Sequence, residues 1–517
     1  MKSRELVNLI GQKEVSMLSR THIHVGLALL FVATSGAASS GKTLIVGQPG
    51  TPCRCRYGLG GILGIVLLVC GLAGAGTTHL MAATTASSGR EGTSFSVLYA
   101  FEAPAPVTFT SRRGSQPDTQ PALGPGNTIY GMTVNGGANG TGVIYRFQLQ
   151  SHRYTLLHTF SALDVNGANE DGAFPGNALT RGPGDVFYGM ASAGGANGTG
   201  TIFKITASGA FTVLHTFSAL DANGNNEGGA VPLRNVVVGN EGNLYGTAAR
   251  GGQNTCTLTS NGCGVAWMMD PSGNNFKVLH QFTAAEGHGA SLLQARDGFF
   301  YGCGVWPATS LSGTALPSGT LYRMTRSGEN FEVLYTFSQT NSSGENTDGA
   351  DCYEPLVETA PGMFYGAAYY GGTNGNGVVF RYSLSNPSVV EVVHDFSATT
   401  AGVNADGANP DGPLIPGRDG TLYSNAWDGG MNGNGVLYGI RPDGSFEVLH
   451  AFSATDPTTG ANKDGANPDD GMVLNESGDA LIGIVVYGGN SSSAGYFNSG
   501  GTLYQLKLDD CGYSGER

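Results

Sequence analysis

Loops rich in aspartate and asparagine hold the residues of this sequence best suited to chemistry. They include DVNGANEDGAFP and SSGENTDGADCYEP, and the hexapeptide DGANPD occurs twice, at 406–411 and 464–469. Carboxylate and amide oxygens are the ligands of Ca²⁺, although this spacing is not that of an EF-hand loop. The same side chains also cap turns by bonding their own backbone. Two interpretations stay open: turn capping, and structural calcium held by Asp406, Asp411, Asp464 and Asp469.

Histidine is the other candidate for metal binding or catalysis. It recurs in VLHTF-like runs as His158, His215, His280, His394 and His450, and Tyr99 and Tyr335 fill the same position in two further copies. Because each lies in a different repeat, the five rings cannot converge on one ion, and we predict that they pack, with one ring nitrogen bonded locally. No GxSxG, HExxH or phosphate-loop motif is present. A pair of carboxylates that cleaves a sugar has no fixed spacing and stays an alternative.

The elements that must position these residues are short strands. VLHTF-like runs end at Phe101, Phe160, Phe217, Phe282, Phe337, Phe396 and Phe452, a period of 55 to 65 residues. Three further apolar runs recur in each period, all too short for helices and separated by Gly, Asn and Ser. Four strands repeated seven times predict an all-β fold, a seven-bladed β-propeller of four-stranded antiparallel blades.

The two ends of the repeat region are complementary. The first repeat element, 95–101, is of the fourth-strand type, and the last, 501–507, is of the third-strand type. We therefore predict that the N-terminal strand closes the last blade, which leaves no blade incomplete. A solenoid is the alternative, but it would not need complementary ends.

Strand parity places the long loops on one face of such a propeller. Connections between blades and loops from second to third strand share that face, and Trp306, Trp427, Tyr369 and Tyr370 fall in them. Aromatic planes beside Asp and Asn bind sugars, although exposed aromatic rings also cap contacts between blades. We expect these four residues to line a ligand-binding site.

Five cysteines follow residue 90. Cys256 and Cys263 flank one loop, TLTSNG, so we predict that they form a disulfide. Cys303 and Cys352 lie in adjacent repeats and form a second candidate pair, whereas the partner of Cys511 stays open.

The repeat resembles the GloVer (Gloeo-Verruco) tandem repeat of bacterial choice-of-anchor proteins. The resemblance lies in runs such as Gly242-Asn243-Leu244-Tyr245-Gly246, Gly200-Thr201-Ile202-Phe203-Lys204 and Val213-Leu214-His215-Thr216-Phe217, and it covers about residues 94–507. It implies an exported, surface-associated repeat protein with no established chemistry.

The N-terminal part differs from the rest in composition. Residues 1–90 carry a net charge of +6 against −13 for the whole chain, which leaves −19 for the remainder. Two apolar segments, 24–38 and 57–76, predict a leader over 1–90 that is a signal peptide or a membrane anchor. We expect the propeller over 91–510, a short tail over 511–517, and an exported protein in the periplasm, outside the cell or on its surface.

The net negative charge disfavours nucleic acid and anionic lipid as binding partners, because both are bound by surfaces rich in Lys and Arg. We expect a monomeric binding module for a glycan or a protein, with no cofactor apart from structural calcium if the loops hold it. The alternative is a polysaccharide-active hydrolase or lyase on the same scaffold. Fold alone does not decide between them.

Overall fold

A computed structural model of the chain describes residues 93–176, 178–254, 262–305, 318–489 and 499–508. Every regular element in these ranges is a β-strand, and the strands form seven separate antiparallel sheets that are the blades of a propeller. None of the described segments is a helix of the length and apolarity needed to cross a membrane. The predicted leader, 1–90, and the tail, 511–517, lie outside the described residues.

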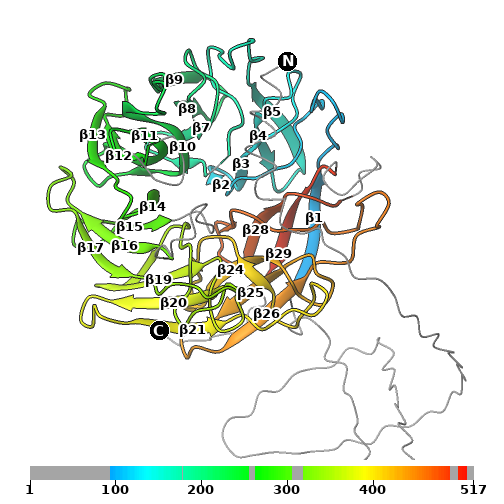
Figure 1. Ribbon diagram of the computed structural model, residues 1–517. Helices are drawn as coiled ribbons and strands as arrows, with labels where there is room; N and C mark the ends of the chain where they lie inside the picture. Colours follow the sequence, from blue (N-terminus) through cyan, green and yellow to red (C-terminus); the bar gives the residue numbers. More distant parts are fainter. Residues whose placement is uncertain (1–92, 177, 255–261, 306–317, 490–498, 509–517) are drawn as a thin grey trace, which may run out of the picture. The chain divides into compact units, whose positions relative to one another are not determined.

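Blades 1 to 4 follow one another along the chain, each numbered from its inner strand outward (Figure 1). Blade 1 comprises β2 (Ala122–Gly124), β3 (Thr128–Thr133), β4 (Val143–Gln148) and β5 (Arg153–Thr159). Blade 2 comprises β6 (Thr180–Arg181), β7 (Val186–Ala191), β8 (Thr201–Thr206) and β9 (Phe211–Thr216). Blade 3 comprises β10 (Asn226–Val238), β11 (Leu244–Gly252), β12 (Val265–Met269) and β13 (Lys277–Gln281). Blade 4 comprises β14 (His288–Gln294), β15 (Phe300–Val305), β16 (Thr320–Met324) and β17 (Glu332–Thr336).

Blades 5 to 7 complete the ring. Blade 5 comprises β18 (Val357–Ala360), β19 (Met363–Ala368), β20 (Val378–Ser383) and β21 (Val390–Asp395). Blade 6 comprises β22 (Ala408–Pro410), β23 (Ile415–Pro416), β24 (Leu422–Asp428), β25 (Val436–Ile440) and β26 (Phe446–Ala451), with β22 and β23 both paired to β24. Blade 7 comprises β27 (Met472–Leu474), β28 (Ala480–Val485), β29 (Thr502–Lys507) and, as its outer strand, β1 (Ser94–Ala100).

The pairing of β1 with β29 confirms the predicted closure. The two strands are antiparallel, with Phe95 opposite Leu506 and Ala100 opposite Thr502. In Figure 1 the blue β1 lies beside the red β29, so the first and last strands of the repeat region share one blade.

Buried aromatic side chains explain why glycine follows tyrosine in the second strand of most blades. In blade 1 a Cβ on Gly131 would lie 2.5 Å from the hydroxyl oxygen of Tyr145, whose ring is fully buried above it. Only glycine leaves room for that ring, so the Tyr-Gly pair follows from packing within a blade.

Stacked rings hold neighbouring blades together. The ring of each of the five repeat histidines lies 3.6 to 3.8 Å, centroid to centroid, from a phenylalanine at the start of the next blade's outer strand. At the closure this partner of His450 is Phe95 of β1. The predicted packing role of the histidines is therefore what the structure shows.

A second recurring contact fixes the segment that leads into the inner strand of a blade, which we call the axial segment; in blade 3 this segment is part of β10 itself. In six blades one residue of this segment is left-handed, with φ between 53° and 58°, and its N–H donates to a carbonyl of the preceding blade. Gln116 donates to Gly500 in this way across the closure.

Candidate functional site

Carboxylates in the loops between blades separate into two groups. The first group, the outer latches, joins a carboxylate of the connecting loop to a side chain of the outer strand before it. The five latches are His158–Asp171, His280–Glu286, Tyr335–Asp348, His394–Asp406 and His450–Asp464, with donor–acceptor distances of 2.7 to 3.1 Å. Each carboxylate also accepts a backbone N–H, such as that of Ser453 for Asp464 at 3.1 Å.

Bonding within the latch favours the ionised carboxylate. Although burial acts to raise their pKa values, hydrogen bonds from the histidine and from the serine hold the pKa of Asp406 and of Asp464 below the ordinary range. Two of the four predicted calcium ligands are therefore committed to bonds within the protein, and an ion at Asp406 or Asp464 would have to displace them.

Asparagine side chains in the same loops act as turn caps. The side chain of Asn169 accepts the N–H groups of Gly172 and Gly195 at 2.9 and 2.8 Å and donates to the carbonyls of Ser161 and Gly172. The same pattern recurs at Asn226, Asn346, Asn404 and Asn462. Turn capping thus accounts for much of the asparagine content of these loops.

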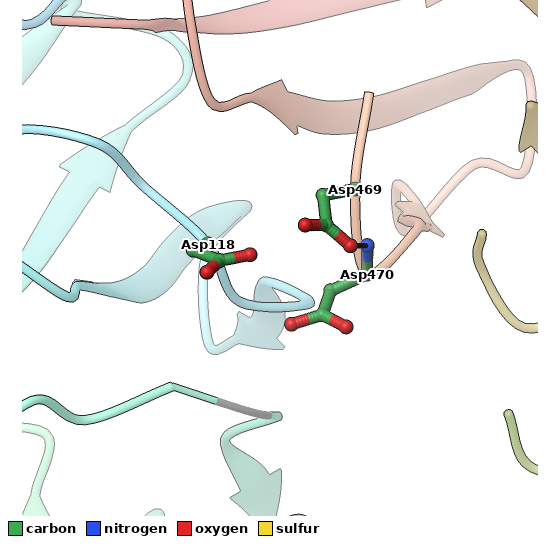
Figure 2. A group of neighbouring side chains, drawn as sticks. All are labelled: Asp118, Asp469 and Asp470. Atoms are coloured by element: carbon green, nitrogen blue, oxygen red, sulfur yellow. Dashed lines mark hydrogen bonds between the residues drawn. The ribbon is translucent and has the colours of Figure 1, made fainter. Parts of the chain in front are cut away.

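The second group, the axial carboxylates, lies where axial segments of different blades meet. It consists of Asp118 of blade 1, Glu354 of blade 5, Asp411 of blade 6, and Asp469 and Asp470 of blade 7. One oxygen each of Asp118, Asp469 and Asp470 lies within 4.8 Å of the others. Figure 2 shows the side chain of Asp118 facing the two aspartates of blade 7. Such a set of oxygens could hold a cation or accept bonds from hydroxyl groups.

One basic side chain enters this group from blade 3. Nη1 of Arg234 lies 2.7 Å from Oε1 of Glu354 and 3.3 Å from Oδ1 of Asp470. Its guanidinium carbon lies 4.2 Å from the ring centroid of Tyr353, whose hydroxyl donates to Asp411 at 2.9 Å. Because Arg234 contacts blades 5 and 7, which are not its neighbours, these groups must lie at the centre of the ring.

The pKa shifts among the axial carboxylates are opposite in direction to those of the latch aspartates. Burial, together with the charge of Glu354, raises the pKa of Asp411 to about 8. Burial and the neighbouring carboxylates also raise the pKa values of Asp469 and Asp470 well above the ordinary range. The centre therefore holds protons or attracts cations more strongly than exposed carboxylates do.

Aromatic side chains border the axial carboxylates on the loop-rich face. Tyr369, which follows β19, lies 5.6 Å from Tyr353 and 4.6 Å from Tyr370, which is 40% exposed. Burial and the charges of Asp411, Tyr370, Asp428 and Asp469 raise the pKa of Tyr369, which places the ring near those carboxylates.

The predicted loop position of Trp427 is wrong, because the residue belongs to β24 near its end. Its side chain is half-buried and makes an edge contact with Tyr487, with 6.0 Å between the ring centroids. The side chains of Asn409 and Asn467 in the next blades each donate at 3.1 Å to the carbonyls of Tyr369 and Trp427, so the two residues are held in equivalent places. Three of the four predicted ligand-binding aromatic residues thus lie on the loop-rich face, and Trp306 lies outside the described residues.

One disulfide is described in full. Cys303 of β15 is bonded to Cys352 of the axial segment of blade 5, with 5.7 Å between their Cα atoms, so it links adjacent blades. Cys263 is buried and disulfide-bonded. Cys256 lies outside the described residues, so the Cys256–Cys263 pairing stays a prediction.

Sequence reasoning missed Asp118, Arg234 and Glu354 as candidate residues of the centre. A signal was present, because all three follow the GA-x-P motif or its variant at the same one or two positions that Asp411, Asp469 and Asp470 occupy. Aligning the repeats at that motif, rather than at their acidic residues, would have brought them together.

Comparison with known proteins finds solved structures of low similarity. Similar solved structures include an oligogalacturonate lyase in complex with manganese, with 12% identity, a TM-score of 0.46, and coverage of 82% of this chain and 99% of that one. An oligogalacturonate lyase from Vibrio parahaemolyticus shows 12% identity, a TM-score of 0.44 and coverage of 82% and 99%. A puromycin-hydrolysing peptidase of Mycobacterium tuberculosis shows 10% identity, a TM-score of 0.43 and coverage of 74% and 52%. At these similarities none of their activities transfers to this chain.

No curated protein matches the chain. The model of the Gloeobacter/Verrucomicrobia repeat matches it twice, over residues 70–302 and 255–497. Together the two matches span residues 70–497, which is most of the sequence and all of the propeller except its C-terminal end. The chain therefore belongs to the Gloeobacter/Verrucomicrobia repeat family.

Proposed function

We propose that this protein is a binding module for a glycan, and that the site is the centre of its loop-rich face. The observation that carries the proposal is the position of Tyr369 near Asp411 and Asp469, with the ring of Tyr370 in contact with it. Trp427 holds the equivalent place in the next blade. Rings that present a flat apolar surface stack on sugars, and carboxylate oxygens accept bonds from sugar hydroxyls.

The cost in stability of the axial carboxylates also supports a binding role. Several carboxylates held together away from water destabilise a fold unless they are protonated or paired. The outer latches need one acid each for structure, whereas the centre gathers five acids around one arginine. A group of carboxylates that costs stability and lies at the centre of a propeller is a candidate for function.

Export is part of the proposal. The Cys303–Cys352 disulfide is of the kind that persists in oxidising compartments, and both sulfurs are buried. We therefore propose that the protein works outside the cytoplasm, as a monomer. Fractionation of cells, followed by alkylation under non-reducing conditions, tests this location.

A glycan array and a polysaccharide-depletion assay with the full chain test the binding role. Trp427→Ala and Tyr370→Ala should each weaken binding about ten-fold, the loss expected for one stacking contact. Val389→Ala is the control, because that side chain is 50% exposed but lies in the turn between β20 and β21, on the opposite face. Full affinity in both variants would place the site elsewhere, and binding of proteins but no glycans would change the ligand class.

A hydrolase or lyase is the second candidate, favoured by one observation. Burial and the charge of Glu354 raise the pKa of Asp411 to about 8, a value that suits a general acid, and other carboxylates lie near it. Release of reducing ends or of unsaturated products from a bound polysaccharide, lost in Asp411→Asn, would establish catalysis. Binding without any product would leave the protein a binding module.

A further inference from the structure

Arg234 is an unusual member of the axial segments. At the two positions that follow the GA-x-P motif, the described residues of the other blades are acidic, aromatic or uncharged, and Arg234 is their one basic side chain. Its backbone is left-handed, with φ of 71°, and its side chain is 25% exposed, against 6% for Glu354 and 12% for Asp470. The guanidinium therefore reaches from blade 3 into the carboxylates of two other blades.

The guanidinium already occupies a place that suits a cation. It pairs with Glu354 and Asp470 and lies over the ring of Tyr353 at 4.2 Å, a combination of carboxylates and an aromatic face that attracts positive charge. Burial acts to lower the pKa of Arg234, but Glu354 and Asp470 outweigh it and raise the pKa. The protein thus carries its own cation among the axial carboxylates.

Two of the five axial carboxylates are occupied by this pairing. One oxygen of Glu354 and one of Asp470 pair with Arg234. Among the described residues, Asp118 and Asp469 are not paired with it, and Figure 2 shows Asp118 facing the two aspartates of blade 7, with one oxygen of each of the three within 4.8 Å of the others. Without Arg234 the same centre would present all its acids to a ligand, and an ammonium group or a divalent cation would be preferred over a neutral molecule.

We infer that Arg234 determines the charge of the ligand that the centre of the loop-rich face accepts, by filling the cation position between Glu354 and Asp470. Uncharged sugars can then bind beside it, whereas metal ions and cationic sugars compete with a tethered guanidinium. The choice of neutral sugars rests on the proposed function, but the exclusion of cations can be tested without any glycan.

The test compares the full-length wild type with Arg234→Gln, using Ca²⁺ alone as the probe in calorimetry and in thermal unfolding. We expect Arg234→Gln to bind Ca²⁺ at least ten-fold more tightly than the wild type. Its Tm should be lower than that of the wild type without calcium and should recover as calcium is added, because an ion that binds the native state stabilises it by mass action. Chitosan oligomers, which are cationic, should also bind Arg234→Gln more tightly than the wild type.

Arg181→Gln is the matched control. It removes an exposed arginine–aspartate pair, Arg181–Asp185 at 2.6 Å, near the short turn between β6 and β7, and should leave calcium affinity unchanged. A folded Arg234→Gln protein with wild-type calcium affinity overturns the inference.

If Arg234→Gln does not fold at any calcium concentration, Arg234→Gln/Glu354→Gln replaces it, since that variant leaves no unpaired Glu354. This double variant should still bind Ca²⁺ more tightly than the wild type through the aspartates of blades 1 and 7. If its calcium affinity equals that of the wild type, the inference is overturned. A gain in calcium affinity with no glycan bound by the wild type refutes the proposed function alone. Glycan binding by the wild type without that gain refutes the role of Arg234 alone.

Discussion

The two aspartates of the hexapeptide DGANPD have opposite roles in the same protein. Asp464, the first, is bonded to His450 and Ser453 at the outer edge of blade 6, and its pKa lies below the ordinary range because of those bonds. Asp469, the last, lies at the centre beside Asp118 and Asp470, and burial with its acidic neighbours raises its pKa. The two carboxylates are five positions apart in the sequence, yet the first lies where its ionised form is stabilised and the second where ionisation costs stability.

The difference comes from the ring and not from the hexapeptide. Asp406 and Asp411 repeat it one blade earlier, with Asp406 in a latch and Asp411 at the centre. Each connecting loop runs from an outer strand to an inner one, so its first residues bond to the outer strand that it leaves and its last residues approach axial segments of other blades. Predictions that remove one member of the pair therefore separate structure from function.

The largest effect is expected from Asp464→Ala. The change removes the partner of the His450 ring nitrogen and of the Ser453 N–H and hydroxyl, and it leaves those groups partly buried and unbonded. Stability should fall by about 3 kcal/mol, measured by denaturant unfolding, with ligand binding retained. Asp443→Ala, which removes an exposed turn cap, should change stability little. A loss in Asp464→Ala no greater than in this control would contradict the latch.

Asp411→Asn should act in the opposite direction. Because the pKa of Asp411 is raised to about 8, the native state keeps a proton that the unfolded state releases near pH 4, and stability is lost as the pH rises between these values. Asparagine still accepts the Tyr353 hydroxyl and carries no charge, so it should add about 2 kcal/mol at pH 8 and little at pH 4. Denaturation at the two pH values measures the gain, and an equal effect at both would contradict it.

The sequence predicted the architecture better than the site. Strand number, blade number and closure follow from short-range periodicity and from strand types at the two ends, and the pairing of β1 with β29 confirms them. The separation of Asp406 from Asp411 depends on which blade each side chain faces, which no spacing reveals. The contact of Arg234 with Glu354 spans 120 residues of sequence and three blades, so it appears only when the ring is closed.

The smallest expected effect concerns the one repeat histidine without a latch in the described structure. His215 stacks on Phe276, but Gly228 stands in its loop where Asp171 stands in that of His158. Burial lowers the pKa of His215 to about 4, so stability is complete above pH 6.5 and falls as the pH drops toward 4. A Cβ on Gly228 has room, since its nearest neighbour would be Cε1 of Phe276 at 3.8 Å.

Gly228→Asp should therefore install the missing latch. Glycine replacement alone stabilises by restricting the unfolded chain, so Gly228→Ala is the reference. Relative to it, Gly228→Asp should gain about 1 kcal/mol at pH 7.5 from the bond to His215. The gain should grow by about 1 kcal/mol at pH 5, because a facing carboxylate removes the cost of protonating the ring and solvent screens part of the charge. Equal stability of the two variants at both pH values would show that the aspartate alone does not form the latch and that other residues of the loop are needed. Blade 2 would then share only the stacking of His215 with the other blades.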